Sequence, residues 1–297
     1  MGSHVLGIDI GGTSVKLGIV QDGQEIVWRK QIAFVKGDAD QMLSRIAQAA
    51  SEGIKQYHVS HVGVSVAGKV SPKRGTTQAD NLGWMDVPVR HILRKKLSLP
   101  VWMENDAQCA MLAEWRSGAC QGVSNVAYLT YGTGIGGGMI IQGKPYRGRS
   151  HSGGEFGHVI THGGANARRC TCGHRGCYET YASTTALKRM MGNKYSVRQI
   201  VDGAKAGKPL FVKAFDAYMD ELVLGLVSVM AVLSPEMLVL GGGLSNAGDF
   251  FLDSVHAHMA HLEDWLMRPT QVVLAKYGND AGMLGAAAMA DLHFRQS

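Results

Sequence analysis

The chain carries one local pattern twice: an apolar strand, a glycine-rich turn and a second apolar strand. The first copy is "VLGIDIGGTSVKLGIV" (residues 5–20), and the second is "NVAYLTYGTGIGGGMII" (residues 125–141). Each copy begins a stretch in which strand-like and helix-like segments alternate, which is typical of α/β proteins. The repeat therefore predicts a two-lobed α/β fold with a cleft between two related lobes.

The boundary between the lobes is expected near residues 116–122. We assign residues 1–117 to the first lobe and residues 118–280 to a larger second lobe, and the final helix within 281–297 is a candidate to pack back on the first lobe. The remaining predicted elements are strands over 25–34, 61–68, 101–105 and 237–242, and helices over 40–57, 89–97, 107–117, 211–233 and 281–291.

Composition narrows the class of protein. Hydrophobic residues make up 45% and charged residues 18% of the chain, as in ordinary globular enzymes, and no apolar run approaches the ~20 residues of a membrane helix. No signal peptide is visible, so we expect a cytoplasmic protein with reduced thiols and no membrane partner. The net charge is +6, but the basic residues are scattered without interleaved aromatic residues, which argues against nucleic-acid binding.

The first glycine turn is a candidate phosphate site. Gly11, Gly12 and Thr13 follow a strand that carries Asp9, and Lys16 lies just beyond them. Backbone N–H groups of such a turn can approach a phosphate closely, and a carboxylate at this place can hold Mg²⁺ through water. A simple hairpin turn also favours glycine, so this motif alone leaves both interpretations open.

The second turn, Gly132–Thr133–Gly134, repeats the design in the other lobe and favours a nucleotide lying between two phosphate clamps. A third glycine run, which includes Gly242 and Gly243, follows a buried strand and is a candidate to lie beneath an adenosine. Neither a P-loop nor a Rossmann fingerprint is present. Phosphoryl transfer from ATP is therefore favoured over hydride transfer.

A candidate base stands at the join of a predicted strand and helix. "VWMENDAQCA" places Asn105 and Asp106 there. Asp106 could accept the proton of a sugar hydroxyl, and Asn105 could orient a neighbouring hydroxyl. The alternative is that Asp106 only caps the helix, a common task for aspartate.

Three of the five cysteines lie within eight positions, in the spacing C-x-C-x₄-C. Reduced thiolates in this spacing favour Zn²⁺, which takes a fourth ligand. That ligand is open among the histidines of the segment, and the three cysteines are a redox cluster in the alternative interpretation. The residues are Cys170, Cys172 and Cys177, with His151, His158, His162 and His174 as candidates.

Two glutamates flank this segment. Glu155 lies three residues before His158, and Glu179 lies two residues after Cys177. A zinc ion with four protein ligands is structural, so its effect would be to fix both carboxylates where they can accept hydrogen bonds from a polyol. Ordinary surface glutamates are the alternative.

These motifs resemble the ROK (repressor, open reading frame, kinase) family of sugar kinases, within the actin-like ATPase superfamily with its ribonuclease H-like fold. The resemblance runs along essentially the whole chain, through "GIDIGGT", "NLGW", "ENDA", "GTGIGGG", "GEFGH", "CTCGHRGCYETYAS", "LGGGLS" and "NDAGMLGAA". It implies an ATP-dependent kinase of a hexose 6-hydroxyl, most plausibly glucose, and a homodimer. An N-acetylmannosamine or N-acetylglucosamine kinase is the nearest alternative, and a sugar-sensing regulator without a DNA-binding domain is a more distant one.

The resemblance also implies roles for single residues. Asp106 would be the general base, and His158 would complete the zinc site with the three cysteines. The sugar contacts would be Asn81, Asn105, Asp106, Glu155, His158 and Glu179; ATP and Mg²⁺ would use Asp9, Gly11, Gly12, Thr13, Lys16, Gly132, Thr133, Gly134, Gly242 and Gly243. Two departures from the family pattern are a longer loop before Cys170, which makes His162 a rival fourth ligand, and the missing proline before Asn81.

Overall fold

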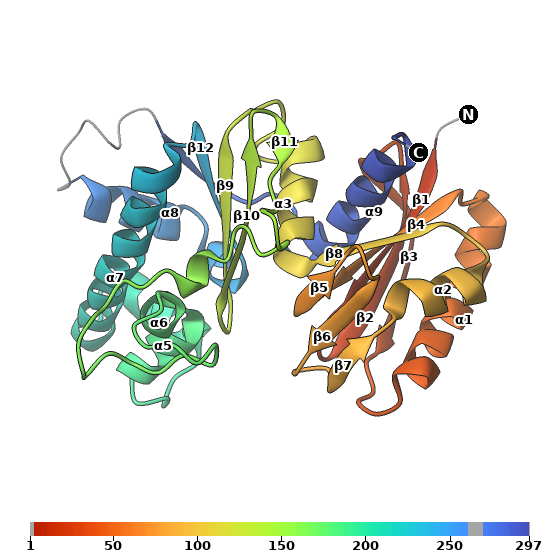
Figure 1. Ribbon diagram of the computed structural model, residues 1–297. Helices are drawn as coiled ribbons and strands as arrows, with labels where there is room; N and C mark the ends of the chain where they lie inside the picture. Colours follow the sequence, from red (N-terminus) through yellow and green to blue (C-terminus); the bar gives the residue numbers. More distant parts are fainter. Residues whose placement is uncertain (1–2, 261–269, 297) are drawn as a thin grey trace. The chain divides into compact units, whose positions relative to one another are not determined.

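The computed structural model describes residues 3–260 and 270–296, and the chain divides into two compact units (Figure 1). Unit 1 comprises Met1–Gly122, Gly148–His151 and Asn279–Ser297, and unit 2 comprises Val123–Arg147 and Ser152–Gly278. Ser297, the end of the segment that we considered for the first lobe, lies outside the described residues.

Unit 1 continues past Ser117, where we expected the first lobe to end. The segment after this helix turns back on Glu114, whose main-chain oxygen accepts from the amides of Gly118 (3.0 Å) and Cys120 (3.2 Å) and whose side chain accepts from the amide of Ala119 (2.9 Å). These bonds attach the residues up to Cys120 to the helix that precedes them.

A five-stranded mixed sheet forms the centre of unit 1, in the order β3-β2-β1-β4-β8. Its strands are β1 (His4–Ile10), β2 (Ser14–Gln21), β3 (Glu25–Ala33), β4 (His61–Val66) and β8 (Val101–Asn105). The pairs β1/β2 and β2/β3 are antiparallel, whereas β4 runs parallel to both β1 and β8. Helices α1 (Ala39–Tyr57), α2 (Val89–Leu97), α3 (Asp106–Ser117) and α9 (Ala281–Phe294) and a small sheet of β5 (Lys69–Ser71), β6 (Thr76–Ala79) and β7 (Trp84–Val87) complete the unit.

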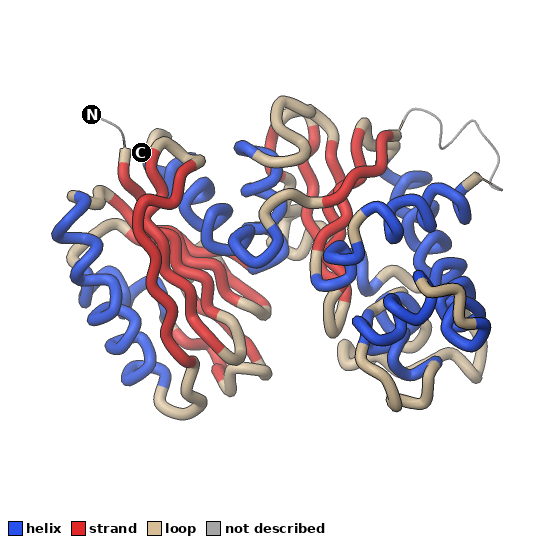
Figure 2. Tube along the Cα trace, turned by 180° about the vertical axis from the view of Figure 1, so that it is seen from behind, coloured by secondary structure: helices blue, strands red, loops and turns tan. Residues whose placement is uncertain are grey.

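The two faces of this sheet differ in character, as expected for strands whose side chains alternate. On one face Leu6, Ile8 and Val64 join a buried apolar core with Leu43 and Ile46 of α1. The other face is occupied by α9, which packs on β1, β4 and β8 (Figure 2). The sheet therefore has one face built by large side chains and one built for close approach of a helix.

Glycines on the α9 face allow the helix backbone to touch the strands. A Cβ atom on Gly7 would lie 2.2 Å from the main-chain oxygen of Met283, and one on Gly63 would lie 1.8 Å from that of Ala286. Because both obstacles are backbone atoms, no side-chain movement could make room.

We expect Gly63→Ala to lower the free energy of unfolding of unit 1 by about 3 kcal/mol or more, since the added methyl forces α9 off the sheet. Gly163→Ala is the matched control: a Cβ there meets no atom within 4 Å, so its effect should stay within about 0.5 kcal/mol. Urea unfolding of both variants measures the difference. Equal midpoints would show that α9 does not need this close contact.

The sheet of unit 2 begins with the same strand arrangement as the sheet of unit 1. Its strand order is β11-β10-β9-β12-β13, with β9 and β10 antiparallel and β12 parallel to β9 and β13. The strands are β9 (Val126–Tyr131), β10 (Ile135–Ile141), β11 (Lys144–Pro145), β12 (Met237–Gly241) and β13 (Gln271–Leu274). An antiparallel pair joined by a glycine turn and flanked by a parallel strand thus begins both sheets, as the sequence repeat predicts.

The helices of unit 2 gather around α7 (Pro209–Leu233), whose Leu222 and Leu226 enter the same core as Leu129 and Leu240 of the sheet. The others are α4 (Glu179–Ala182), α5 (Thr184–Met190), α6 (Val197–Lys205) and α8 (Asp249–Met259), with the short 3₁₀ turns η1 (Phe156–His158) and η2 (Gly243–Ala247). A third 3₁₀ turn, η3 (Gly278–Asp280), lies where the chain passes from unit 2 to unit 1. Among the described residues, no helix has the length and apolarity that a bilayer crossing requires.

Candidate functional site

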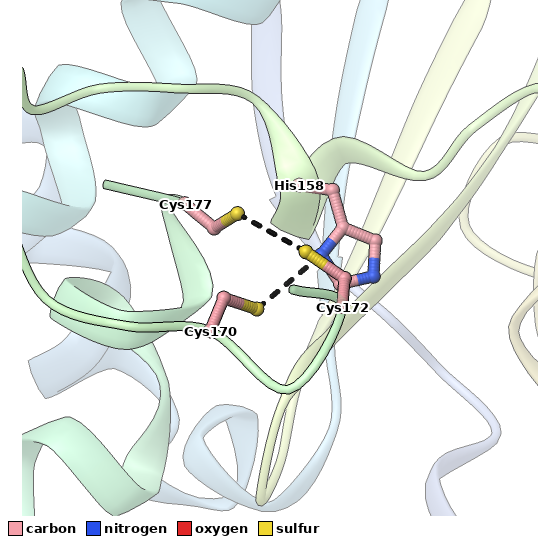
Figure 3. Close-up of side chains that lie close together, drawn as sticks. All are labelled: His158, Cys170, Cys172 and Cys177. Carbon is pink, nitrogen blue, oxygen red and sulfur yellow. Dashed lines mark hydrogen bonds between the residues drawn. The ribbon is translucent and has the colours of Figure 1, made fainter. Parts of the chain in front are cut away.

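The cysteine segment folds into one cluster of four metal-ligating side chains (Figure 3). The ligand atoms of His158, Cys170, Cys172 and Cys177 all lie within 4.8 Å of one another. The Sγ atoms of Cys172 and Cys177 are 3.5 Å apart, and the Cys170 Sγ lies 3.7 Å from the Nδ1 atom of His158. Three thiols and one imidazole at this spacing fit a tetrahedral Zn²⁺ site.

The rival histidines lie elsewhere or outside the group of four. The ring of His162 stacks on Tyr181 with 3.7 Å between centroids, and its Nε2 atom lies 3.4 Å from the Glu221 carboxylate. His174 places its Nδ1 atom 3.6 Å from the Cys172 Sγ but is not part of the group. The structure therefore favours His158 over His162 as the fourth ligand.

The thiols differ in acidity. Burial raises the pKa of Cys170 to about 12, whereas the backbone of His174 lowers the pKa of the exposed Cys172 to about 6 through a hydrogen bond. Cys172 is thus the thiol that most readily offers a thiolate to an incoming cation, and binding would release protons from the others.

The predicted sugar contacts of unit 2 lie beside this cluster. The Nε2 atom of His158 is 4.0 Å from the Glu155 carboxylate, and its Nδ1 atom is 3.8 Å from that of Glu179. Glu179 also accepts a 2.9 Å hydrogen bond from the Cys170 thiol. Glu155 and His158 remain about half exposed, with side-chain exposures of 52% and 38%, so both can reach a ligand.

A cavity of about 670 Å³ lies next to the second glycine turn of unit 2. Gly132 and Thr133 line one part of it, and apolar side chains of α6 and η2 line another: Val197, Val201, Leu244 and Ala247. Gly242 precedes η2 with a φ of +86°, and a Cβ there would lie 2.5 Å from the Tyr131 carbonyl oxygen. Gly132 and Gly243 therefore border a pocket whose walls combine these apolar side chains with polar ones, a composition suited to a flat base and ribose. The polar lining residues include Arg198, Asp202, Lys205 and Asn246.

In unit 1, Asp9 lies on the α9 face of the sheet. Ser65 on the neighbouring strand donates a 2.8 Å hydrogen bond to its carboxylate, and Lys16 lies 3.8 Å away. Burial raises the pKa of Asp9, against the effects of Ser65 and Lys16. A Cβ on Gly282, the second residue of α9, would lie 2.6 Å from the carboxylate carbon, so a larger residue there would displace the Asp9 side chain.

The first glycine turn follows the strand of Asp9 and contains three further residues that the sequence predicted for the site, Gly11, Gly12 and Thr13. The Gly11 amide donates to the Ser14 oxygen (3.1 Å), which closes the turn, and a Cβ on Gly12 would lie 3.6 Å from the side-chain nitrogen of Asn81. Thr13 fixes the other side of the turn, because its main-chain oxygen accepts from the Phe34 amide (3.0 Å). Asn81 therefore lies beside the turn.

Asp106 is the exposed first residue of α3, and Asn105 caps the helix. The Asn105 Oδ1 accepts from the amides of Ala107 (2.9 Å) and Gln108 (3.2 Å), and its amide group donates to the Gly68 oxygen (3.0 Å). The N-cap is thus Asn105 and not Asp106, although the Asp106 carboxylate also accepts from the Ala107 amide (2.9 Å). Asn105 is largely occupied with this role.

Carboxylates gather around the buried thiol of Cys109. Desolvation raises its pKa well above the ordinary value, and the negative charges of Glu104, Asp9 and Asp106 add to the effect. The strand register agrees: Asp9 pairs with Ser65, and Ser65 pairs with Glu104, two residues before Asp106. Asp9 and Asp106 therefore lie in one acidic neighbourhood, at the same end of neighbouring strands. Sequence reasoning missed Ser65 in this group, although a serine within the apolar run "HVGVSV" was the available signal.

Comparison with known proteins places this geometry in a family. The family model described as "ROK family" matches residues 5–292. The glucokinase of Halalkalibacterium halodurans is 31% identical over 308 residues, covering 94% of this chain and 92% of that protein. The N-acetyl-D-glucosamine kinase of Yersinia pseudotuberculosis is also 31% identical, over 295 residues that cover 95% and 97% of the two chains.

A solved structure agrees with these relatives. A ROK family glucokinase from Streptomyces griseus, in complex with glucose and AMPPNP, superposes with a TM-score of 0.83 at 31% identity and covers 99% of this chain and 100% of that chain. The resemblance stated from the motifs is confirmed, as is the α/β fold of the actin-like ATPases. The chain belongs to the ROK family.

Proposed function

We propose that the protein transfers the γ-phosphoryl group of ATP to the 6-hydroxyl of a hexose, with glucose as the preferred acceptor. The observation that carries the proposal is the exposed Asp106 carboxylate at the end of β8, in one acidic neighbourhood with Asp9 of β1 near the glycine turn. The glucokinase relatives support the same reaction class, a phosphotransferase with an alcohol group as acceptor.

Asp106 is the proposed general base. A hydroxyl nucleophile loses its proton late in a loose phosphoryl-transfer transition state, so a positioned carboxylate of ordinary basicity is sufficient. Asn105 has one amide hydrogen left beyond its contact with Gly68, and this hydrogen can donate to a hydroxyl. Asn81, close to the first turn, is a further proposed sugar contact.

In unit 2, the proposed partners of sugar hydroxyls are Glu155, His158 and Glu179. The Nδ1 atom of His158 lies toward Cys170 and its Nε2 atom toward Glu155. One imidazole can therefore serve the metal through one nitrogen and a sugar hydroxyl through the other, an arrangement that fixes the tautomer.

ATP and Mg²⁺ are assigned to the glycine turns. Asp9 is the proposed carboxylate for hydrated Mg²⁺, with Lys16 as a positive charge near the phosphates. The proposed phosphate contacts are Gly11, Gly12, Thr13, Gly132, Thr133 and Gly134. Gly242 and Gly243 are the proposed adenosine contacts: Gly243 lines the pocket, and Gly242 directly precedes Gly243.

Zn²⁺ is the proposed structural ion, held by His158, Cys170, Cys172 and Cys177. Four protein ligands leave no open coordination position, so the ion would shape the loop rather than act on the substrate. We also propose a homodimer in the cytoplasm; the apolar exposed residues of α7, Leu224 and Val232, support a contact between copies.

An N-acetylhexosamine kinase is the second candidate, favoured by the 31% identity to an N-acetyl-D-glucosamine kinase. A coupled ADP-release assay with Mg-ATP distinguishes the two across glucose, mannose, N-acetylmannosamine, N-acetylglucosamine, fructose and cellobiose. We expect the highest kcat/KM for glucose, with the product phosphorylated at the 6-position by NMR. A higher value for an N-acetylated sugar would support the second candidate, and no turnover on any sugar would contradict the proposed kinase.

A further inference from the structure

The turn Gly132–Gly134 is hydrogen-bonded by side chains from residues 179–185, a short segment that follows Cys177, the last cysteine of the metal cluster. The Gly132 oxygen accepts two hydrogen bonds from Thr184, one from the backbone amide (2.9 Å) and one from the hydroxyl (2.7 Å). The hydroxyl of Thr185 donates to the Thr133 oxygen (2.8 Å). Two consecutive threonines thus hold two consecutive carbonyl groups of the turn.

Glu179 makes a third connection, with one carboxylate oxygen on each side. Its Oε2 atom accepts from the Ile135 amide at 3.4 Å and lies 2.6 Å from the place of a Cβ atom on Gly134. Its Oε1 atom accepts from the Cys170 thiol at 2.9 Å. The end of the turn and a metal-cluster cysteine therefore share one carboxylate, which is only 17% exposed.

The segment that carries these contacts is itself fixed. The fully buried Tyr178 donates from its hydroxyl to the Leu222 oxygen of α7 (2.5 Å), and its amide donates to the Val159 oxygen (2.8 Å). Gly225 leaves room for the Tyr178 ring, because a Cβ there would lie 2.1 Å from it. Ser183 caps α5 by accepting from the Ala186 amide (3.2 Å).

These contacts orient the backbone N–H groups of the turn, which are the donors that a phosphate would bind. With the carbonyls of Gly132 and Thr133 engaged by the threonines, the turn cannot rotate its peptide planes without breaking hydrogen bonds. In the described part of the chain, the amide N–H groups of Thr133 and Gly134 make no hydrogen bond, which leaves them to bind anionic oxygen. Thr184 also lines the 670 Å³ cavity together with the turn.

We propose that Thr184 and Thr185 are positioning residues for the nucleotide, and that residues 177–185 couple the metal centre to the ATP-binding turn. The inference rests on the proposed function in one respect, that this turn binds the phosphates of ATP. Metal bound at Cys177 fixes the start of the segment that leads through the buried Tyr178 to Thr184 and Thr185. Metal binding also removes the proton that the Cys170 thiol shares with Glu179, so the coupling runs through the chain itself. Metal and nucleotide then strengthen each other's binding by the same factor.

The first test uses the metal-loaded protein. We expect the double variant Thr184→Val/Thr185→Val to raise the KM for ATP about tenfold, because two hydrogen bonds to the turn are lost, with kcat and the KM for glucose close to wild type. Thr270→Val is the matched control, since the Thr270 hydroxyl likewise donates to a loop carbonyl, that of Pro235 (2.7 Å), away from the turn. An unchanged KM for ATP in the double variant would overturn the positioning role.

The second test measures coupling without activity. A fluorescent ADP analogue should bind about tenfold more weakly to chelator-treated protein, and zinc affinity from chelator competition should rise by the same factor when ADP is saturating. In the double variant, the effect of zinc on nucleotide affinity and the effect of ADP on zinc affinity should both fall toward a factor of one. Equal nucleotide affinity with and without zinc would overturn the coupling, whereas a wild-type protein that binds the analogue but phosphorylates no sugar would count only against the proposed function.

Discussion

Replacing Asp106 by Asn is expected to lower kcat for glucose about a thousandfold, within the range that a positioned general base contributes. The amide keeps the size of the side chain and its place at the first residue of α3, but it cannot accept the proton of the 6-hydroxyl. The Asn105 side chain continues to cap the helix, so the local fold should persist. Steady-state kinetics with Mg-ATP should show a nearly unchanged KM for glucose.

Asp249→Asn is the matched control for this variant. Asp249 is likewise exposed and is the first residue of its helix, α8. Both substitutions remove a negative charge from a helix N-terminus, at a cost of about 0.3–1 kcal/mol of stability. Only Asp106→Asn should lose activity; an Asp106→Asn protein with more than about a tenth of wild-type kcat would remove this residue from the role of base.

Replacing Cys177 by Ser is expected to reduce bound zinc from about one ion per chain to an undetectable level, because one of four ligands is lost from a closed tetrahedral site. Cys177 is fully buried, so water cannot take its place at the ion without a cavity opening. Glu179 and His158 then lose their common anchor, and we expect less than about a hundredth of wild-type activity, in line with the large free energy of structural zinc. Elemental analysis and the coupled assay give the two readouts.

Cys120→Ser makes the same chemical change at a second fully buried thiol, outside the cluster. It should keep its zinc and most of its activity, with a loss of about 1–2 kcal/mol of stability from placing a hydroxyl in an apolar site. Full activity in a zinc-free Cys177→Ser protein would contradict a structural role of the metal.

The sequence predicted the elements whose pattern is strong and local. Helix α2 begins and ends at Val89 and Leu97 as expected, and the strand over 101–105 is β8 without a shift. By contrast, the helices α5 and α6 and the strands β5, β6 and β7 were not assigned. The strands are three or four residues long and mix polar with apolar side chains, so their pairing with each other, and not their own pattern, defines them.

In the candidate site, too, the features set by local sequence were predicted, and those set by contacts between distant residues were not. Spacing alone indicated the three cysteine ligands, because thiolates close together in sequence are close together in space. The residues alone left the fourth ligand open, and the family resemblance indicated His158. The structure supports that choice, because His162 stacks against Tyr181, a contact that no local pattern reveals. The hydrogen bond from the Thr184 hydroxyl to the Gly132 carbonyl joins residues 52 positions apart, so it could not be predicted from the local sequence.

The close fit of α9 against Gly7 and Gly63 has a consequence for biosynthesis. The helix that completes the sheet of unit 1 is separated in sequence from that sheet by almost all of unit 2. At a ribosomal rate of about 5–20 residues per second, the nascent N-terminal sheet would wait on the order of ten seconds or more with its glycine-bearing face uncovered. Newly made chains should therefore bind chaperones chiefly through this face. A truncated chain that ends before α9 should leave the face uncovered and be degraded.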